Sequence, residues 1–377
     1  MKILHVISNL EIGGAQRVRL ELVRRMLITG DVAQEHRIVY FQDGPIHKKF
    51  ETLGIKTHHV PLKLWNLGIP AWCQLQKIVA DFSPSILHSQ LWAANVVARM
   101  LAHHNGLPVI CDLHNMPEVN GHAKNLLERF FPLPASAFVA VSDAVAAAHQ
   151  KHLGINSIVI KNGVDANKFR FSFAAREELR TELNISDNCF VVGAVGRLDE
   201  VKSFDNLLKA YAAMLAKMRA CDHPLQYNCR LVIVGNGPLK RKLQLLAEEL
   251  GIIQNLIFAS ANRSMYRYYS LFDCLAISSR SEGLSVAMLE ALFSGLQVVC
   301  TMPAAQHDII VDGQNGFLVP FADHKAMAYA LLKIADNFDA EFQARPARID
   351  NNFEVSNMAS RYQQLYFDVL AGLAGAK

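Results

Sequence analysis

The sequence has few features of extracellular, metal-binding or membrane-spanning proteins. Its seven cysteines include no C-x-x-C pair and no regular spacing to histidine, which argues against a zinc site and against a disulfide framework. No apolar run approaches the roughly 18 residues that cross a bilayer. The apolar start of the chain, MKILHVIS, is too short for a secretion signal. We therefore expect a cytoplasmic protein, which could lie peripherally on the inner face of a membrane.

Charged residues are sparse, and neither sign dominates. They make up 19% of the chain and leave a formal net charge of +4, which is too small to indicate a nucleic-acid-binding protein. Hydrophobic residues make up 51%, enough for well-buried sheets. Because 377 residues are too many for one ordinary domain, we expect two.

Short apolar runs alternate with longer amphipathic stretches along the whole chain. A first series comprises ILHVIS, HRIVYF, SILHS, PVICDLH and AFVAVS, and a second comprises CFVVGAVGRL, CRLVIVGNGP, NLIFAS, DCLAISS and LQVVCT. Continuously apolar runs are typical of parallel strands covered on both faces. The predicted fold class is therefore α/β, with two doubly wound, Rossmann-like domains that face a cleft.

The domain boundaries follow from the restart of this rhythm. We predict a first, acceptor-binding domain over residues 1–168, a second, donor-binding domain over 169–352, and a C-terminal crossover helix over 353–377 that packs back on the first domain. The Asn-Gly turn in IVIKNGVDANKF and the polar helix after it are predicted to form the linker. The last helix has apolar residues at helical spacing, at Met358, Tyr362, Leu365, Tyr366 and Val369.

Ligands of open parallel sheets bind at the carboxyl ends of strands, so the residues there are candidates. Gly13 and Gly14 follow the first strand and open a helix, where backbone N–H groups could approach an anion. A simple tight turn explains the pair equally well. The chain lacks the G-x-G-x-x-G pattern of dinucleotide sites, and the glycines of VGNGP are expected to serve tight packing.

Two cations follow the strand VVGAVG. Arg197 and Lys202 would suit a diphosphate, because arginine binds it in a fork and lysine acts as a point charge. The alternative is a solvated loop in which Asp199 and Glu200 are their partners.

The stretch SRSEGLSVAMLEALFSG places two glutamates around a predicted helix start. The main-chain N–H groups of Gly283, Leu284 and Ser285 could receive phosphate or sugar oxygens. Glu282 could accept hydrogen bonds from sugar hydroxyls, and Glu290 could reach the vicinal diol of a second ring such as a ribose. For either glutamate alone, helix capping or an exposed surface is the preferred explanation. Capping is also enough to explain the neighbouring Ser278 and Ser279.

A histidine follows the strand PVICDL in the first domain. At that position His114 could donate to a substrate hydroxyl or take part in proton transfer. Most histidines in a chain that has 15 of them are ordinary surface residues, so only its position distinguishes this one.

Together these segments resemble the GT-B retaining glycosyltransferases of the large E-x7-E family, which is family 4-like and belongs to group 1. The resemblance rests on SNLEIGGAQR, CDLHNMP, VAVSDAV, IKNGVD, GAVGRLDEVKSFDNLLKA, LVIVGNGPLKRKLQ, SEGLSVAMLEALFSGLQVV and DGQNGFLVP, in this order. It implies transfer of a sugar from a nucleotide diphosphosugar, most commonly a UDP-sugar, with retention of configuration. The implied acceptor is a glycan or a lipid-linked molecule of envelope polysaccharide, lipopolysaccharide or glycan assembly.

The resemblance also implies roles for individual residues. The catalytic residues would be His114, Arg197, Lys202 and Glu282. The donor-binding residues would be Gly13, Gly14, Arg197, Lys202, Phe258, Ser260, Glu282, Gly283, Leu284, Ser285 and Glu290. No cofactor or metal is implied, and the chain contains no D-x-D motif.

The sequence departs from the family pattern in one donor-side segment. Gln297 stands where proline is usual, Ala304 and Ala305 replace glycines, and His307 lies where an acid is common. The resemblance implies that this segment approaches the donor sugar. On the acceptor side, Val60–Lys77 and Arg129–Phe138 mix aromatic and basic residues, which would suit an anionic lipid surface. A buried helix face with a loop is the plainer interpretation of both.

Three other functions are weighed against transfer. A nucleotide-sugar-binding protein without turnover would not need the whole set of motif residues. A nucleotide-sugar epimerase of the same fold would convert the donor without an acceptor. A nicotinamide oxidoreductase is disfavoured because the dinucleotide fingerprint is missing.

Overall fold

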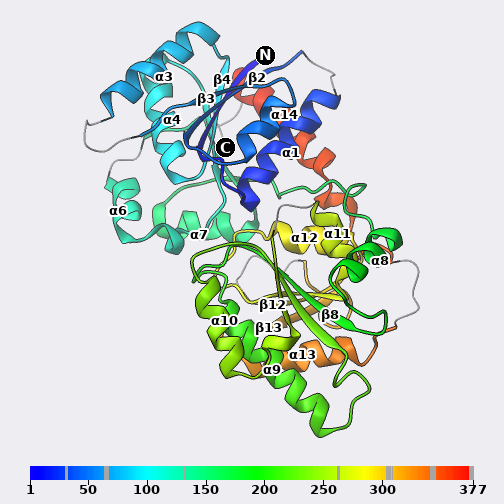
Figure 1. Cartoon of the computed structure of the whole chain (residues 1–377). Helices are drawn as coiled ribbons and strands as arrows, with labels where there is room; N and C mark the ends of the chain where they lie inside the picture. The colour runs from blue at the N-terminus through cyan, green and yellow to red at the C-terminus, as the bar shows by residue number, and fades with distance from the viewer. Residues whose placement is uncertain are drawn as a thin grey trace. The chain divides into compact units, whose positions relative to one another are not determined.

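The computed structural model describes residues 1–29, 33–62, 68–130, 133–260, 264–302, 307, 309–339 and 345–372. It contains two compact units (Figure 1). Unit 1 comprises Met1–Gly163 together with Asn352–Lys377, and unit 2 comprises Val164–Asn351. Each unit contains one parallel sheet with helices, which confirms the predicted α/β class with two doubly wound domains.

The sheet of unit 1 has the strand order β3-β2-β1-β4-β5-β6-β7. Its strands are β1 Lys2–Asn9, β2 Glu35–Gln42, β3 Lys56–His59, β4 Ile86–Gln90, β5 Val109–Leu113, β6 Ala137–Ala140 and β7 Ile158–Val159. Its helices are α1 Gly14–Thr29, α2 Ile46–Glu51, α3 Ile69–Phe82, α4 Trp92–Asn105, α5 Pro117–Asn120, α6 His122–Phe130, α7 Asp143–Leu153 and α14 Val355–Leu370.

Successive residues of a strand point to opposite sides of the sheet. The strands of this sheet are apolar on both sides, so helices cover both faces. Val6 of β1 packs in a core with Leu75 of α3. Ile7, the next residue, packs in a separate core with Val23 of α1. The strand order reverses between β1 and β4, and ligands of doubly wound sheets bind at such a switch point.

The C-terminal helix α14 belongs to unit 1, as predicted. It packs against α1. The residues that the sequence placed on its apolar face are all buried, namely Met358, Tyr362, Leu365, Tyr366 and Val369. Unit 1 is therefore built from both ends of the chain.

The sheet of unit 2 has the strand order β10-β9-β8-β11-β12-β13. Its strands are β8 Phe190–Val195, β9 Cys229–Val234, β10 Leu256–Ala259, β11 Cys274–Ile277, β12 Gln297–Thr301 and β13 Gly316–Val319. Its helices are α8 Phe173–Glu182, α9 Phe204–Ala220, α10 Lys240–Glu249, α11 Met265–Leu271, α12 Val286–Phe293 and α13 His324–Ala335. The order reverses between β8 and β11. A core on one side joins Val192 of β8 to Leu207 of α9 and Leu331 of α13.

The structure corrects the interpretation of the segment between the two sheets. β7 is a strand of the first sheet, and α8 packs against α11 inside unit 2. Arg176 and Arg180 of α8 form ion pairs with Asp273, so the helix is part of unit 2 and not of a linker.

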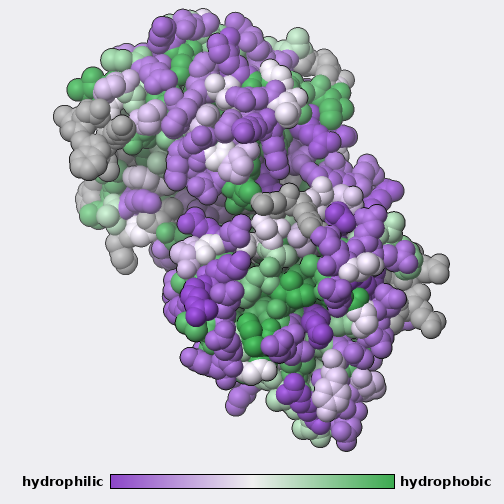
Figure 2. Space-filling model, viewed as in Figure 1, coloured by the Kyte–Doolittle hydropathy of each residue, from purple (hydrophilic) through white to green (hydrophobic). Residues whose placement is uncertain are grey.

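The surface agrees with this burial of apolar residues. The view in Figure 2 is mostly hydrophilic, with a large group of hydrophobic residues on unit 2 and smaller hydrophobic spots on unit 1. None of the helices in the described parts of the chain combines the length and hydropathy that a membrane crossing requires.

Candidate active site

The loops at the switch point of unit 2 bring together two of the predicted catalytic residues. β8 and β11 are neighbours in the sheet, so the segments after them lie at the same edge. Lys202, after β8, donates to Oε1 of Glu282, after β11. The Lys202 side chain is 26% exposed and that of Glu282 is 14% exposed. The pair is therefore partly shielded from water, which strengthens its attraction.

Hydrogen bonds to the main chain hold the two loops in register. Ser278 Oγ donates to the carbonyl oxygen of Lys202 at 2.8 Å, and the N–H of Arg280 donates to the carbonyl of Val201 at 2.8 Å. Ser279 Oγ donates to Oε1 of Glu282 at 2.8 Å. The capping interpretation of Ser278 and Ser279 is thus wrong, because both hydroxyls fix the Lys202–Glu282 pair.

Glycines make this arrangement possible. The Lys202 side chain runs along Gly196, where an added Cβ would lie 3.2 Å from its Cε. An added Cβ on Gly235 would lie 1.8 Å from the carbonyl oxygen of Gly196. The VGNGP turn therefore needs glycine for tight packing against the strand that leads to Lys202, as predicted.

Arg197 differs from Lys202 in its surroundings. Its side chain is 65% exposed, and its Nε lies 3.8 Å from Asp199 Oδ2. Glu200 is paired instead with Lys242, at 3.6 Å. Arg197 therefore contacts Asp199, as the solvated-loop alternative predicted. The Lys202 ammonium pairs instead with Glu282, which that alternative did not predict. An exposed guanidinium beside the Lys202–Glu282 loops can bind an anion without first leaving a buried partner.

Glu290 lies inside α12, in a strongly apolar environment. It is 2% exposed, and the buried Tyr269 donates its hydroxyl hydrogen to Oε2 at 2.6 Å. Its neighbours Leu289 and Ala291 are completely buried. Burying a carboxylate is costly unless donors satisfy it, so a position such as this is not explained by an exposed helix surface.

The start of α12 and the end of β10 carry the remaining residues predicted in unit 2. Gly283, Leu284 and Ser285 are buried, and Ser285 is the N-cap residue of α12 without a side-chain capping bond. Phe258 is half-buried in β10, with the Lys240 ammonium 5.9 Å from its ring centre.

Strand β10 is the edge strand of the described sheet and pairs there only with β9. Its outer main-chain groups can therefore bind a planar polar ring. After it, the carbonyl of Ser260 accepts a hydrogen bond from the Tyr268 hydroxyl at 3.2 Å.

In unit 1, the predicted glycine loop follows β1. Gly14 begins α1, and the carbonyl of Gly13 accepts the N–H of Arg17 at 3.1 Å. An added Cβ on Gly13 would lie 2.4 Å from Oε1 of Gln16, whose amide donates to Asn9 Oδ1 at 2.7 Å. The tight turn is therefore real, and Gly14 at its end is exposed.

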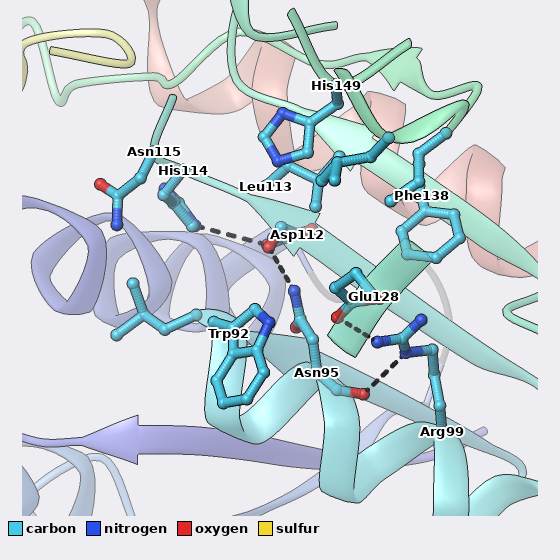
Figure 3. Close-up of a pocket in the computed structure, with 13 residues that line it drawn as sticks. Trp92, Asn95, Arg99, Asp112, Leu113, His114, Asn115, Glu128, Phe138 and His149 are labelled. Carbon is cyan, nitrogen blue, oxygen red and sulfur yellow. Dashed lines mark hydrogen bonds and ion pairs between the residues drawn. The ribbon is translucent and has the colours of Figure 1, made fainter. Parts of the chain in front are cut away.

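His114 follows β5 and lines a pocket of unit 1 with Trp92, Asn95, Phe138 and others (Figure 3). It is 9% exposed, so it is not an ordinary surface histidine. Its Nε2 lies 3.8 Å from Oδ2 of Asp112. Within the described residues this nitrogen has no hydrogen-bond partner. The imidazole is therefore held with its buried Nε2 beside a carboxylate.

Asp112 was missed by the sequence interpretation. It is buried and accepts from Arg19 at 2.6 Å, His88 at 3.0 Å and Tyr362 at 3.0 Å. The available signal was the occurrence of polar residues inside otherwise apolar strands: His5 in ILHVIS, His88 in SILHS and Asp112 in VICDL.

Two predicted features fall partly outside the described residues. Ala304 and Ala305 are outside the described residues. His307, which stands where an acid is common in the family, is described and exposed. Part of Val60–Lys77 and part of Arg129–Phe138 are also outside the described residues. The described part of the first stretch contains α3, whose Ala71, Leu75 and Ile78 are buried.

Comparison with known proteins agrees with this geometry. The glycosyl transferases group 1 model matches residues 175–351, and the glycosyltransferase family 4 model matches residues 12–168. The D-inositol 3-phosphate glycosyltransferase of Corynebacterium jeikeium (strain K411) is 26% identical over 306 residues, which cover 74% of this chain and 70% of that protein. The enzyme of the same name from Corynebacterium glutamicum (strain R) is 23% identical over 369 residues, covering 90% and 84%.

Solved structures show the same fold. Alr3699/HepE of Anabaena, crystallised in complex with UDP and glucose, matches with a TM-score of 0.82 at 20% sequence identity. The match covers 98% of this chain and 100% of that one. With both sheets, the switch-point pair and both family models in agreement, the chain belongs to the group 1, family 4-like glycosyltransferases.

Proposed function

We propose that this glycosyltransferase transfers a sugar from a nucleotide diphosphosugar, with UDP as the nucleotide, to a glycan or lipid-linked acceptor, and that it retains the configuration of the sugar. The carrying observation is the Lys202–Glu282 pair at the switch point of unit 2. UDP is favoured because Alr3699/HepE of Anabaena was crystallised with UDP and with UDP-glucose. Assembly of envelope polysaccharide, lipopolysaccharide or another glycan would be the corresponding pathway class.

Arg197 and Lys202 are proposed to bind the diphosphate and to stabilise its departure. As the bond between the sugar and the diphosphate breaks, negative charge grows on the leaving phosphate, and cations already in place lower the barrier. Glu282 keeps Lys202 in position before the donor arrives and can accept a hydrogen bond from the sugar. The N–H groups of Gly283 and Ser285 at the start of α12 would add the positive end of a helix dipole.

The nucleoside is proposed to bind further along unit 2. Glu290 would accept from the ribose diol while the Tyr269 hydroxyl holds one of its oxygens. Main-chain groups between Phe258 and Ser260 would bind the base. In unit 1, Gly13 and Gly14 would contribute N–H groups to the phosphates.

His114 is proposed to contact a hydroxyl of the transferred sugar, as the catalytic residue of unit 1. Retention is not explained by the double displacement of many glycosidases, which needs one carboxylate on each side of the reacting bond. Here both motif glutamates belong to unit 2 and are assigned to the donor. We also propose that no metal is required, because the cations and the helix start offset the phosphate charge.

The donor assignment predicts selective nucleotide binding. The panel comprises UDP, GDP, ADP, UDP-glucose, UDP-galactose, UDP-N-acetylglucosamine and GDP-mannose. UDP and one of the UDP-sugars should raise the melting temperature of the protein. Arg197→Ala and Glu290→Gln should weaken this binding at least tenfold, since a hydrogen bond to a charged group contributes about 1.5–3 kcal/mol. Glu282→Gln should mainly lower kcat for the release of UDP from the donor. Because no metal is proposed to take part, EDTA should not change these results.

The matched control is Glu178→Gln, which removes an exposed carboxylate paired with Arg267 in the same unit. It should bind and turn over as the wild type does. Absence of any nucleotide shift, a shift with NAD alone, or wild-type kcat/KM in both motif variants would overturn the donor assignment. Conversion of the donor into another nucleotide sugar without UDP release would favour the epimerase.

Peripheral membrane contact is proposed for α6 of unit 1. Leu126 is 57% exposed and Leu127 is 43% exposed, and the exposed Lys124 lies on the same short helix. Exposed leucines beside a lysine suit the boundary of an anionic bilayer.

Leu126→Ser with Leu127→Ser should therefore reduce co-flotation with vesicles that contain anionic lipid several-fold. Leu245→Ser, which changes a 42% exposed leucine of unit 2, is the control. Equal flotation of all three proteins would contradict this surface.

A further inference from the structure

Asp112 lies at the centre of a buried group of side chains from four elements of unit 1. Its Oδ2 accepts from Nη2 of Arg19 on α1 at 2.6 Å. Its Oδ1 interacts with Nε2 of His88 on β4 at 3.0 Å and accepts from the hydroxyl of Tyr362 on α14 at 3.0 Å. His114, two residues later in the chain, places its Nε2 3.8 Å from Oδ2 (Figure 3). The carboxylate thus links the C-terminal helix to the proposed catalytic histidine.

The hydrogen-bond donors in this group can be assigned because a carboxylate only accepts. His88 must carry its proton on Nε2 to donate to Asp112, which leaves Nδ1 as an acceptor. The Tyr366 hydroxyl lies 2.6 Å from that Nδ1 and therefore donates to it. Helix α14 consequently fixes Asp112 twice, directly through Tyr362 and indirectly through Tyr366 and His88.

Asp112 remains ionised in this environment. Burial by itself would raise its pKa, but the contacts with His88 and Arg19 hold the pKa of Asp112 well below its usual range. Arg19 also donates from Nη1 to His5 Nδ1 at 3.0 Å and from Nε to Gln90 Oε1 at 3.1 Å, so the guanidinium cannot easily turn away. His114 therefore faces a fixed negative charge.

A fixed carboxylate selects between the two tautomers of a neighbouring neutral histidine. The separation of 3.8 Å is too long for a hydrogen bond, but the negative charge still favours a proton on the nitrogen that faces it. With its proton on Nε2, His114 keeps a lone pair on Nδ1.

We propose that Asp112 is a positioning residue that holds His114 in the Nε2–H form, and that Tyr362 and Tyr366 of α14 keep Asp112 in place for this purpose. This inference rests on the proposed function of His114. It specifies that function further, because His114 would accept a hydrogen bond from a sugar hydroxyl through Nδ1 rather than donate one. A group that only fastened α14 to the sheet would affect stability and leave the His114 tautomer unchanged.

The test compares Asp112→Asn and Tyr362→Phe with Gln364→Ala. Gln364 is an exposed residue of α14 whose amide bonds only to Asp368 among the described contacts, so it is the matched control. Nitrogen-15 spectra of protein labelled on histidine report the tautomer of His114, assigned by the signal lost in His114→Gln. Release of UDP from the donor reports kcat and KM.

We expect the Nε2–H form in the wild type and in Gln364→Ala, and a mixture of tautomers in the other two variants. kcat should fall about tenfold in Asp112→Asn and three- to tenfold in Tyr362→Phe, with donor KM within twofold. An Nδ1–H wild type, or wild-type tautomer and kcat in Tyr362→Phe, would overturn the proposal. If Asp112→Asn does not fold, the tautomer and kcat of Tyr362→Phe test the proposal. If the wild type releases no UDP, the proposed function is wrong. The nitrogen-15 spectra then test by themselves whether Asp112 sets the tautomer of His114.

Discussion

Lowering the pH from 7 to 4 should destabilise the protein by several kcal/mol, with the loss arising in unit 1. Burial, with the nearby Arg19 guanidinium, lowers the pKa of His36 and that of His88 to about 4. Both are therefore neutral in the folded chain over a range in which an unfolded histidine, with a pKa near 6.5, takes up a proton. Stability is complete above about pH 6.5 and falls as the pH drops towards 4. Each histidine contributes about 3 kcal/mol to the loss.

Hydrogen bonds explain why His36 and its neighbour His5 stay neutral. Arg19 can only donate, so Nδ1 of His5 accepts from it and Nε2 of His5 carries the proton. That Nε2 lies 3.0 Å from Nδ1 of His36, which must accept in turn. The chain of donors ends at Nε2 of His36, which has no partner within the described residues. Protonation of either histidine would set one donor against another.

Urea titrations at pH 7, 6, 5 and 4 measure this loss directly. His36→Asn keeps an acceptor for His5 and removes the titrating ring, so its stability should depend less steeply on pH, by about 1.4 kcal/mol per unit between pH 6 and 5. A wild-type stability that does not change between pH 6.5 and 4.5 would contradict the assignment of neutral buried histidines.

Asp273→Asn should lower the free energy of unfolding by about 3–5 kcal/mol. The Asp273 carboxylate is 3% exposed and pairs with Arg176 at 2.8 Å, Arg180 at 3.2 Å and Arg345 at 2.8 Å. It also accepts the N–H of Val191 at 2.8 Å. Asparagine fills the same volume but removes the negative charge that the three ion pairs share, so the guanidinium groups lose this countercharge. Burial lowers the pKa of Arg345 to about 10 even though Asp273 acts to raise it, so loss of the carboxylate should make the charge of Arg345 less favourable.

The comparison is a urea titration of Asp273→Asn beside Asp205→Asn. Asp205 forms an exposed pair with Lys209 on α9, at 3.9 Å, and exposed pairs contribute little. Equal midpoints for the two variants would mean that the Asp273 group is dispensable.

The main strands could be predicted because each is a continuous apolar run between turn signals. β1 and β8 are of this kind, and parallel packing then follows. β3, β7 and β13 escaped prediction for different reasons. β3 (KTHH) contains no apolar run, and β7 has only 2 residues. β13 is as long as the predicted β10, but its strand state depends on pairing with β12. Local pattern contains no information about such pairing.

The sequence named candidate site residues but not the contacts between them. The order of strands brings Lys202 to Glu282, whereas the sequence offered Asp199 and Glu200 as nearer partners. The groups around Asp112 and Asp273 could not be predicted, because their members are widely separated in sequence. In the sequence, each of these residues is a single polar residue within an apolar strand or an ordinary charged residue on a helix.

The construction of unit 1 from both ends of the chain has a consequence for biosynthesis. Tyr362 is made 250 residues after Asp112, which takes roughly 12–50 s at a ribosome speed of about 5–20 residues per second. During that interval the uninterrupted segment of unit 2 is synthesised in full, while the first sheet still lacks its last helix. The nascent chain can therefore complete its second half before its first, and a stalled or truncated product would contain an Asp112 that lacks both tyrosines.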